Sequence, residues 1–210
     1  MSIGRYQCYA LMRCQDEEKT MSSDRKTSTR QKILEVADNL FYREGIRAVG
    51  VDTIIAQSGV AKTTLYRYFP SKDDLVVAYL EERQNSFKRL FEIAIARYPN
   101  EPKQQIIALF AWLDKYLTKP ECYGCPFLVT ASELPELEHP AHQLAVSNRI
   151  AIRDRLVSLA EAVGVDNPQQ LGVHLLLLID GAFTQRRLFG IEGFDVRLKP
   201  IVAQLVDGNG

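Results

Sequence analysis

The stretch that decides the fold is GVAKTTLYRYFPSK, residues 59–72. It carries three basic side chains and no acidic one. Its two core candidates, Leu65 and Phe69, lie four residues apart and therefore share one face of a helix. The question that this segment raises is what the many hydrogen-bond donors on its opposite face contact.

The sequence around this stretch predicts two short helices. The first covers residues 51–58 and ends at Gly59, and the second covers residues 62–68 and ends before Pro70. Two short helices joined by a three- or four-residue turn with a glycine form a helix-turn-helix. The second helix of this motif lies in the major groove of DNA and contacts bases with residues near its N-terminus.

The exposed side of the second helix has the side-chain chemistry of a DNA-binding surface. Lysine and arginine bond guanine, threonine contacts the methyl group of thymine, and tyrosine hydroxyls reach phosphates. Lys72 lies in the first turn of the next helix, where its charge and free backbone amides are expected to hold a phosphate. The candidate DNA contacts are Lys62, Thr63, Thr64, Tyr66, Arg67, Tyr68 and Lys72.

The charge of the chain is unevenly distributed. Its formal net charge is zero over 210 residues, but residues 22–72 carry nine basic and five acidic side chains. This basic end favours a nucleic-acid partner. There is neither an apolar run long enough to span a membrane nor the apolar core of a signal peptide, so we expect a cytoplasmic protein with its four cysteines reduced.

Helical spacing of apolar residues continues almost to the C-terminus, and no alternating strand pattern occurs, so the predicted fold class is all-α. Ser28 and Gln31 predict a capping box at the start of the first helix, and Ser71 and Asp74 predict another at the start of the fourth. Residues 1–24 are expected to be a flexible arm, with Met21 as a possible natural start. Further helices are predicted at residues 103–117, 128–131, 141–163, 168–189 and 196–206.

Residues 29–83 read TRQKILEVADNLFYREGIRAVGVDTIIAQSGVAKTTLYRYFPSKDDLVVAYLEER. This segment resembles the DNA-binding domain of the TetR/AcrR family of bacterial transcriptional repressors almost from end to end. The resemblance implies a homodimer that reads a pseudo-palindromic double-stranded DNA operator and releases it when a small-molecule inducer binds. It also implies a helix-turn-helix domain at residues 25–72 and a helical ligand-binding and dimerisation domain at residues 73–210, with no enzymatic activity and no cofactor.

Two cap positions depart from the pattern of the family. Gly50 stands before the second helix and Ala61 before the third, where many relatives place a residue with a hydroxyl group. Such a hydroxyl can bond a helix amide or a phosphate. We therefore expect Thr53, together with Thr63 and Thr64, to take over part of that role.

The helix predicted at residues 168–189 is apolar almost all the way round in its middle, which indicates burial on more than one side. By the resemblance, the last two long helices of each subunit form a four-helix dimer interface. The small residues Gly172, Gly181 and Ala182 would let helices approach closely. Asp180 must be paired, for example with Arg149 or Arg186, or must face a pocket.

A ligand pocket is expected among the middle helices. Aromatic side chains would form its apolar wall and a few polar groups would orient the ligand. The tentative ligand-binding residues are Trp112, Tyr116, Cys125, Phe127, Glu133, His174, Asp180, Phe183 and Gln185.

The pairs Cys122/Cys125 and His139/His142 leave other hypotheses open. Their C-x-x-C and H-x-x-H spacing is similar to that of zinc ligands, although the histidine pair is tighter than in zinc fingers. The cysteines could instead form a thiol sensor that releases DNA on oxidation. A cysteine enzyme would need an acidic residue to orient the histidine and an oxyanion site, and the sequence has no motif for either.

Overall fold

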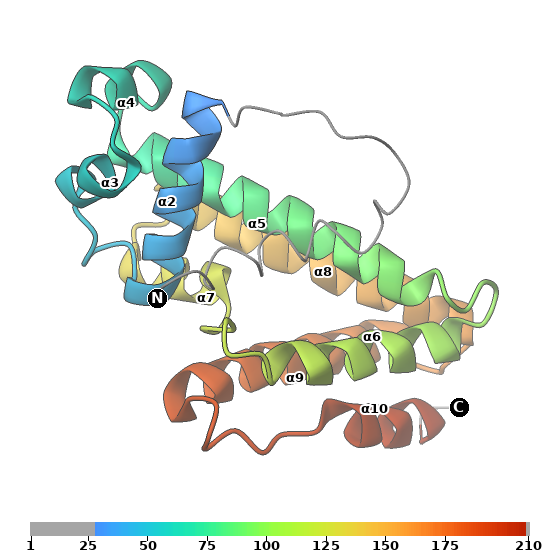
Figure 1. Ribbon diagram of the computed structural model, residues 1–210. Helices are drawn as coiled ribbons and strands as arrows, with labels where there is room; N and C mark the ends of the chain where they lie inside the picture. The colour runs from blue at the N-terminus through green and yellow to red at the C-terminus, as the bar shows by residue number, and fades with distance from the viewer. Residues whose placement is uncertain (1–27, 209–210) are drawn as a thin grey trace, which may run out of the picture.

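The computed structural model describes residues 28–208, and these form nine α-helices and no strand (Figure 1). The fold class is therefore all-α, as the sequence predicts. The expected arm at residues 1–24 lies outside the described residues. The helices are α2 (Thr29–Glu44), α3 (Val51–Ser58), α4 (Lys62–Tyr68), α5 (Lys72–Ile95), α6 (Pro102–Leu117), α7 (Pro126–Glu133), α8 (Pro140–Val163), α9 (Pro168–Phe189) and α10 (Leu198–Asp207).

Helices α2, α3 and α4 pack together at the N-terminal end of the molecule (Figure 1). Helix α2 begins where the Ser28 hydroxyl accepts a hydrogen bond from the Gln31 amide at 3.2 Å, and Gly45 ends it. The Gln31 side chain donates to Glu35, so the other half of the predicted capping box is not formed there. The buried face of α2 forms the floor on which α3 and α4 lie.

Helix α5 connects the N-terminal helices with the rest of the molecule (Figure 1). Ser71 and Asp74 form both halves of a capping box at its start, as predicted. Its first half packs on α2, where the Phe41 and Tyr79 rings lie 5.7 Å apart, and it also contacts α6 and α8. One continuous helix thus contacts both parts of the protein.

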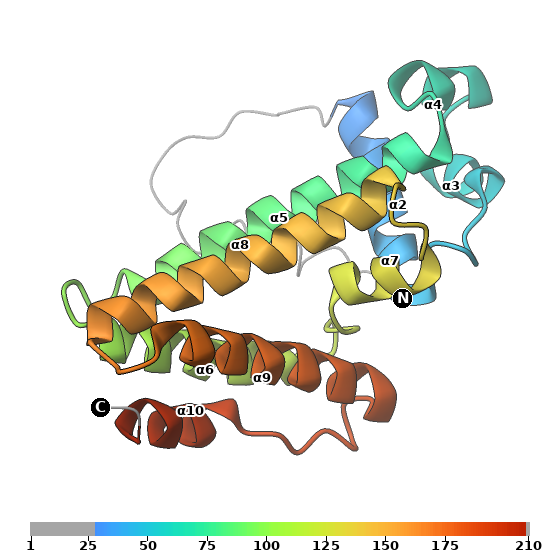
Figure 2. The same cartoon turned by 180° about the vertical axis from the view of Figure 1, so that it is seen from behind.

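The C-terminal helices form a layered bundle. Helices α5 and α8 lie side by side in both views, α6 and α9 lie below them, and α10 covers the outer side of α6 (Figures 1 and 2). A Cβ atom at Gly172 of α9 would lie 3.0 Å from the backbone nitrogen of Val157 in α8, so the absence of a side chain allows this close contact. Gly181 has no atom within 4 Å of such a position and lies on the exposed side of α9.

Helix α10 starts two residues later than the sequence predicts, for a reason that is not local. The Asp114 carboxylate on α6 accepts hydrogen bonds from the backbone amides of Leu198 and Lys199 at 2.7 and 3.1 Å. A carboxylate that bonds free amides stabilises a helix N-terminus. None of the helices in residues 28–208 is both long and apolar enough to cross a membrane.

Candidate DNA-binding helix and ligand cavity

The turn between α3 and α4 depends on Gly59. Its backbone adopts the left-handed conformation (φ 65°, ψ 23°), and its amide donates to the Ile55 carbonyl at 2.9 Å. A side chain would be strained in this conformation. Leu65 and Phe69 then bury one face of α4, and the Arg30 guanidinium lies 5.0 Å from the Phe69 ring. Helix α4 is therefore held by one face and leaves the other free.

The opposite face of α4 is exposed, and the helix contains no carboxylate. Thr64 is half-buried, and the Arg67 guanidinium lies 5.2 Å from the Tyr68 ring. Lys62 forms an exposed ion pair with Asp52 of α3 at 3.3 Å, a kind of pair that contributes little energy in water. The exposed members of the predicted DNA-binding set are Thr53, Lys62, Thr63, Tyr66, Arg67 and Tyr68.

Lys72 has a different environment from the one expected from sequence. Its ammonium donates a hydrogen bond to the Ile46 carbonyl at 2.6 Å and lies 6.0 Å from the Phe41 ring. Partial burial lowers the pKa of this ammonium. The side chain therefore fastens the loop between α2 and α3 in this structure, and a phosphate contact would require it to turn outward.

The two unusual cap positions are those predicted. Gly50 and Ala61 are the N-cap residues of α3 and α4, and neither gives its helix a side-chain hydrogen bond. The free amides at the start of α4 accordingly have no capping hydroxyl.

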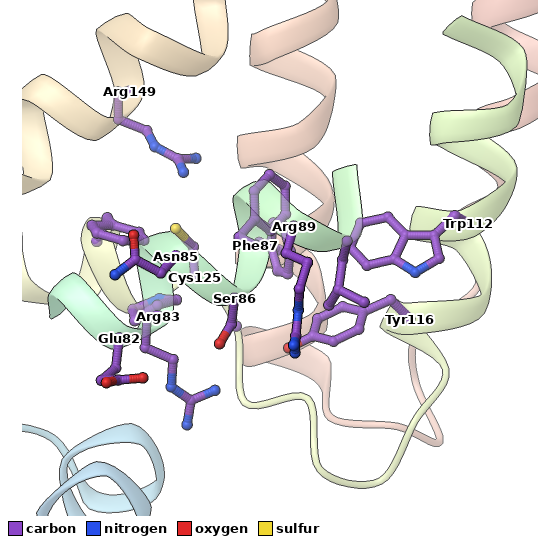
Figure 3. Close-up of a pocket in the computed structure, with 15 residues that line it drawn as sticks. Glu82, Arg83, Asn85, Ser86, Phe87, Arg89, Trp112, Tyr116, Cys125 and Arg149 are labelled. Carbon is purple, nitrogen blue, oxygen red and sulfur yellow. The ribbon is translucent and has the colours of Figure 1, made fainter. Parts of the chain in front are cut away.

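A cavity of about 220 Å³ lies in the C-terminal part, between residues from α5 to α9 (Figure 3). Helix α6 contributes Trp112 and Tyr116, whose rings stack with centroids 5.4 Å apart. Helix α5 contributes the largest share of the wall. The lining residues are Glu82, Arg83, Asn85, Ser86, Phe87, Arg89, Leu90, Trp112, Tyr116, Gly124, Cys125, Pro126, Phe127, Arg149 and Phe183.

Arg149 of α8 points its guanidinium group toward the other labelled cavity residues (Figure 3). One terminal nitrogen donates to Asp180 and the other to Asn148, each at 2.7 Å. The remaining nitrogen, Nε, is buried and has no hydrogen-bond partner. Asp180 is thus paired with Arg149, one of the two arginines predicted from sequence.

Three contacts join the cavity region to α2 and the loop after it. Arg83, which lines the cavity, binds both carboxylate oxygens of the buried Asp38 on α2, at 2.6 and 2.7 Å. The Tyr42 hydroxyl on α2 donates to the Gly124 carbonyl at 3.0 Å. The Glu133 carboxylate accepts from the Arg47 amide at 2.8 Å. Two of the cavity-lining residues, Arg83 and Gly124, are thus hydrogen-bonded directly to α2.

Comparison with known proteins identifies relatives of this chain. A family model described as bacterial regulatory proteins, tetR family, matches residues 33–79. A solved TetR-family transcriptional regulator from Streptomyces coelicolor is 32% identical, with 86% of this chain and 93% of that chain covered and a TM-score of 0.77. The chain belongs to the TetR family. It is a DNA-binding transcriptional regulator of that family.

Other relatives agree with this assignment. A solved TetR transcriptional regulator from Streptomyces avermitilis is 30% identical, covering 87% of this chain and 98% of its own, with a TM-score of 0.75. The HTH-type transcriptional regulator YjdC of Escherichia coli is 21% identical over 74% of this chain and 82% of its own length. The likeness therefore extends beyond the DNA-binding helices into the C-terminal part of this TetR-family chain.

The structure places the tentative ligand-binding residues in two groups. Trp112, Tyr116, Cys125, Phe127 and Phe183 line the cavity. The four others do not. Glu133 bonds the loop after α2, His174 and Gln185 are exposed on α9, and Asp180 lies behind Arg149. The ligand-binding role of these four residues stays a prediction. Outside the cavity lining, α9 turns His174 and Gln185 toward solvent and Asp180 toward α8, and α7 turns Glu133 toward the loop after α2.

Sequence reasoning missed the contribution of α5 to the cavity of this TetR-family regulator. Residues 82–90 read ERQNSFKRL, which is typical of a solvated helix surface. The available signal was Phe87, an aromatic residue within this polar run, whose ring meets that of Trp112 at 5.7 Å. Arg83 and Asn85 could not be assigned to the cavity without knowing which helices pack beside α5.

The cysteine and histidine pairs have structural roles. Cys122 and Cys125 are buried free thiols, and burial raises the pKa of both. His139 caps α8 by accepting from the Ala141 amide at 3.1 Å, and His142 bonds the Leu134 carbonyl at 2.8 Å. No group of residues suited to a metal ion occurs in residues 28–208. The structure gives no support to the metal, thiol-sensor or cysteine-enzyme hypotheses.

The burial of the thiols leads to a testable prediction. Cys122 and Cys125 are expected to react with iodoacetamide at pH 8 at least about tenfold more slowly in the native protein than in urea, because the thiolate is the reactive form. Site-resolved mass spectrometry after timed alkylation measures this. Native-state labelling of either cysteine at the unfolded rate would contradict it and favour a thiol sensor.

Proposed function

We propose that this regulator is a repressor that a small-molecule inducer releases from its operator. The main support for DNA recognition is the exposed face of α4, a helix without any carboxylate. This face presents Lys62, Thr63, Tyr66 and Arg67. Side chains of these types bond base edges and phosphates in the major groove. In this proposal Thr53 adds a contact from α3, and Lys72 reaches a phosphate by leaving the Ile46 carbonyl.

The proposed active form is a homodimer built on α8 and α9. These helices lie side by side on one face of the molecule (Figure 2). That face exposes Val146 and Ile150 on α8 and Val173, Leu177 and Leu188 on α9. Apolar side chains gathered at helical spacing on an exposed face favour an interface between protein chains. A two-fold axis through this face would place two α4 helices for a pseudo-palindromic operator.

Induction is proposed to act through α5. This helix lines much of the cavity with its second half and packs on α2 with its first half. A ligand that binds one orientation of α5 better than another shifts the population toward that orientation. The Arg83–Asp38 pair transmits the shift to α2, and the two α4 helices then no longer match successive major grooves.

Arg67→Ala tests the DNA-binding part of the proposal. The substitution is expected to weaken operator binding by about 1–3 kcal/mol, since it removes a charged donor from the groove-facing side of α4. The dependence of binding on salt should become less steep by about one ion if Arg67 contacts a phosphate. Gel shifts over a salt series, with fragments selected from the source genome as probes, measure both effects.

Arg97→Ala is the matched control for this test. Arg97 is also exposed, but it follows the C-terminal end of α5, far from α4. Its loss should leave both affinity and salt dependence unchanged. Equal affinities for Arg67→Ala and the unaltered protein would show that α4 does not dock as proposed.

A further inference from the structure

The buried Nε group of Arg149 indicates what kind of ligand the cavity takes. Buried hydrogen-bond donors in proteins are almost always paired, because an unpaired one keeps its full desolvation penalty. Nε is the one buried side-chain nitrogen or oxygen in residues 28–208 that lacks a partner. It belongs to a residue that lines the cavity. Nε has almost no accessible surface in this structure, so the acceptor oxygen of a ligand would satisfy it after the Arg149 side chain turns toward the cavity.

The remaining wall indicates the body of the ligand. Phe87, Trp112 and Tyr116 form a continuous aromatic surface, with neighbouring ring centroids 5.7 and 5.4 Å apart. The Arg149 guanidinium itself lies 5.4 Å from the Phe127 ring. Small-molecule pockets usually measure about 300–1,000 Å³. A cavity of about 220 Å³ therefore suits a compact ligand of one or two rings.

The charges of the lining residues indicate the sign of the ligand. Three arginines line the cavity, Arg83, Arg89 and Arg149, against the single carboxylate of Glu82. Arg83 and Arg149 are each paired with a carboxylate that does not line the cavity, on Asp38 and Asp180. A guanidinium binds a carboxylate through charge-assisted hydrogen bonds, which are stronger than those to neutral acceptors. An amine would instead bring a positive charge and further donors to a wall already rich in donors.

We propose that the cavity binds a small aromatic acid, with its ring against Trp112 and Phe127 and its carboxylate on Arg149. This inference rests on the proposed function, in which the same cavity holds the inducer, and it names the chemical class of that inducer. The ligand carboxylate shares the terminal nitrogens of Arg149 with Asp180 and Asn148, and it accepts from Nε when the side chain turns toward the cavity. Selectivity for the acid over its amide comes from the negative charge of the carboxylate, because an amide carbonyl can also accept from the guanidinium.

Matched ligands of different charge test the proposal. The panel comprises benzoate, 3-phenylpropanoate and 2-naphthoate, each with its primary amide and its corresponding primary amine. Trp112 is the only tryptophan of the chain, so quenching of tryptophan fluorescence reports on the cavity wall, and calorimetry checks the affinities. In at least one series, the acid is expected to bind at least about tenfold more tightly than its amide and its amine.

Two arginines of α8 provide matched variants. Arg149→Gln should weaken acid binding at least about tenfold while changing amide binding by less than about threefold. Arg153→Gln should change neither, because Arg153 pairs with Asp154 and does not line the cavity. The double variant R149Q/D180N has no carboxylate at residue 180, so no buried charge is left without its arginine partner. It should show the same loss of acid selectivity even where the single variant folds poorly.

The outcomes separate this proposal from the repressor model. An amide or amine that binds as tightly as the acid in every series, or no binding by any acid, overturns the aromatic-acid proposal. Retention of acid selectivity in R149Q/D180N also overturns it. An acid that binds selectively through Arg149 but leaves the operator complex intact supports the cavity chemistry and contradicts the proposed induction.

Discussion

The substitution Leu177→Asp is expected to convert the protein from a dimer into a monomer and to lower its operator affinity by at least about 100-fold. Leu177 is 63% exposed in the single chain, at the centre of the apolar row on α9. In the proposed dimer a carboxylate at this position would be buried from both subunits without a partner, which is costly. The large loss of operator affinity follows because each subunit would then bind its half-site alone.

Leu137→Asp is the control for this prediction. Leu137 is even more exposed, at 72%, but it lies in the turn between α7 and α8, away from the α8–α9 face. Sedimentation gives the oligomeric state and fluorescence anisotropy with labelled operator gives the affinity. If Leu177→Asp remains a dimer, the interface lies on another face, and a monomeric unaltered protein would refute the dimer proposal altogether.

The helix boundaries that could be predicted from sequence are those set by nearby residues. Helices α3 and α4 have the predicted ends because Gly59 and Pro70 act within one turn of the chain. The capping box of α5 likewise depends on two residues three positions apart. The start of α10 could not be predicted, because Asp114, which caps it, lies more than 80 residues earlier in the chain.

The candidate sites also divide into features set by nearby residues and features set by residues far apart in the sequence. Which side of α4 is exposed follows from the spacing of Leu65 and Phe69, so the candidate DNA-binding face could be located from sequence. The sequence predicts Lys72 in the first turn of α5, where the structure has it, but its bond to the Ile46 carbonyl joins residues 26 positions apart. The cavity depends on several helices at once, and aromatic residues were found more readily than the polar residues of α5.

The Arg83–Asp38 pair is the contact whose loss should most affect the folded state. The side chains are 15% and 6% exposed, and two hydrogen bonds join them across 45 residues of sequence. The Arg83 guanidinium also lies 3.8 Å from the Tyr42 ring. Burial raises the pKa of Asp38, and the charge of Arg83 opposes this increase. Arg83 is therefore the main group that offsets the free-energy cost of burying the Asp38 carboxylate.

Arg83→Met is expected to lower the free energy of unfolding by about 3–5 kcal/mol at pH 8, because it leaves Asp38 buried without its partner. It should also raise the pKa of Asp38 further above its unfolded value. The folded state then holds the Asp38 proton more tightly than the unfolded state does. The contribution of Asp38 to the free energy of unfolding is therefore fully present below about pH 4 and is lost as the pH rises through the folded pKa. The decline can reach about 1.4 kcal/mol per pH unit in that range.

Urea unfolding of the variants between pH 4 and pH 8 tests both the size and the sign of this effect. The double variant R83M/D38N should lack the added pH dependence, since it has no carboxylate to titrate at residue 38.

Arg155→Met is the exposed counterpart. Arg155 also binds both oxygens of a distant carboxylate, on Glu92, at 3.2 and 3.3 Å, but the side chains of that pair are 42% and 49% exposed. Water can solvate Glu92 when its partner is removed, so the loss should stay within about 1 kcal/mol and should not grow with pH. If Arg83→Met and R83M/D38N show the same pH profile, Asp38 reaches water without Arg83, and Arg83 is not the group that stabilises this carboxylate inside the protein.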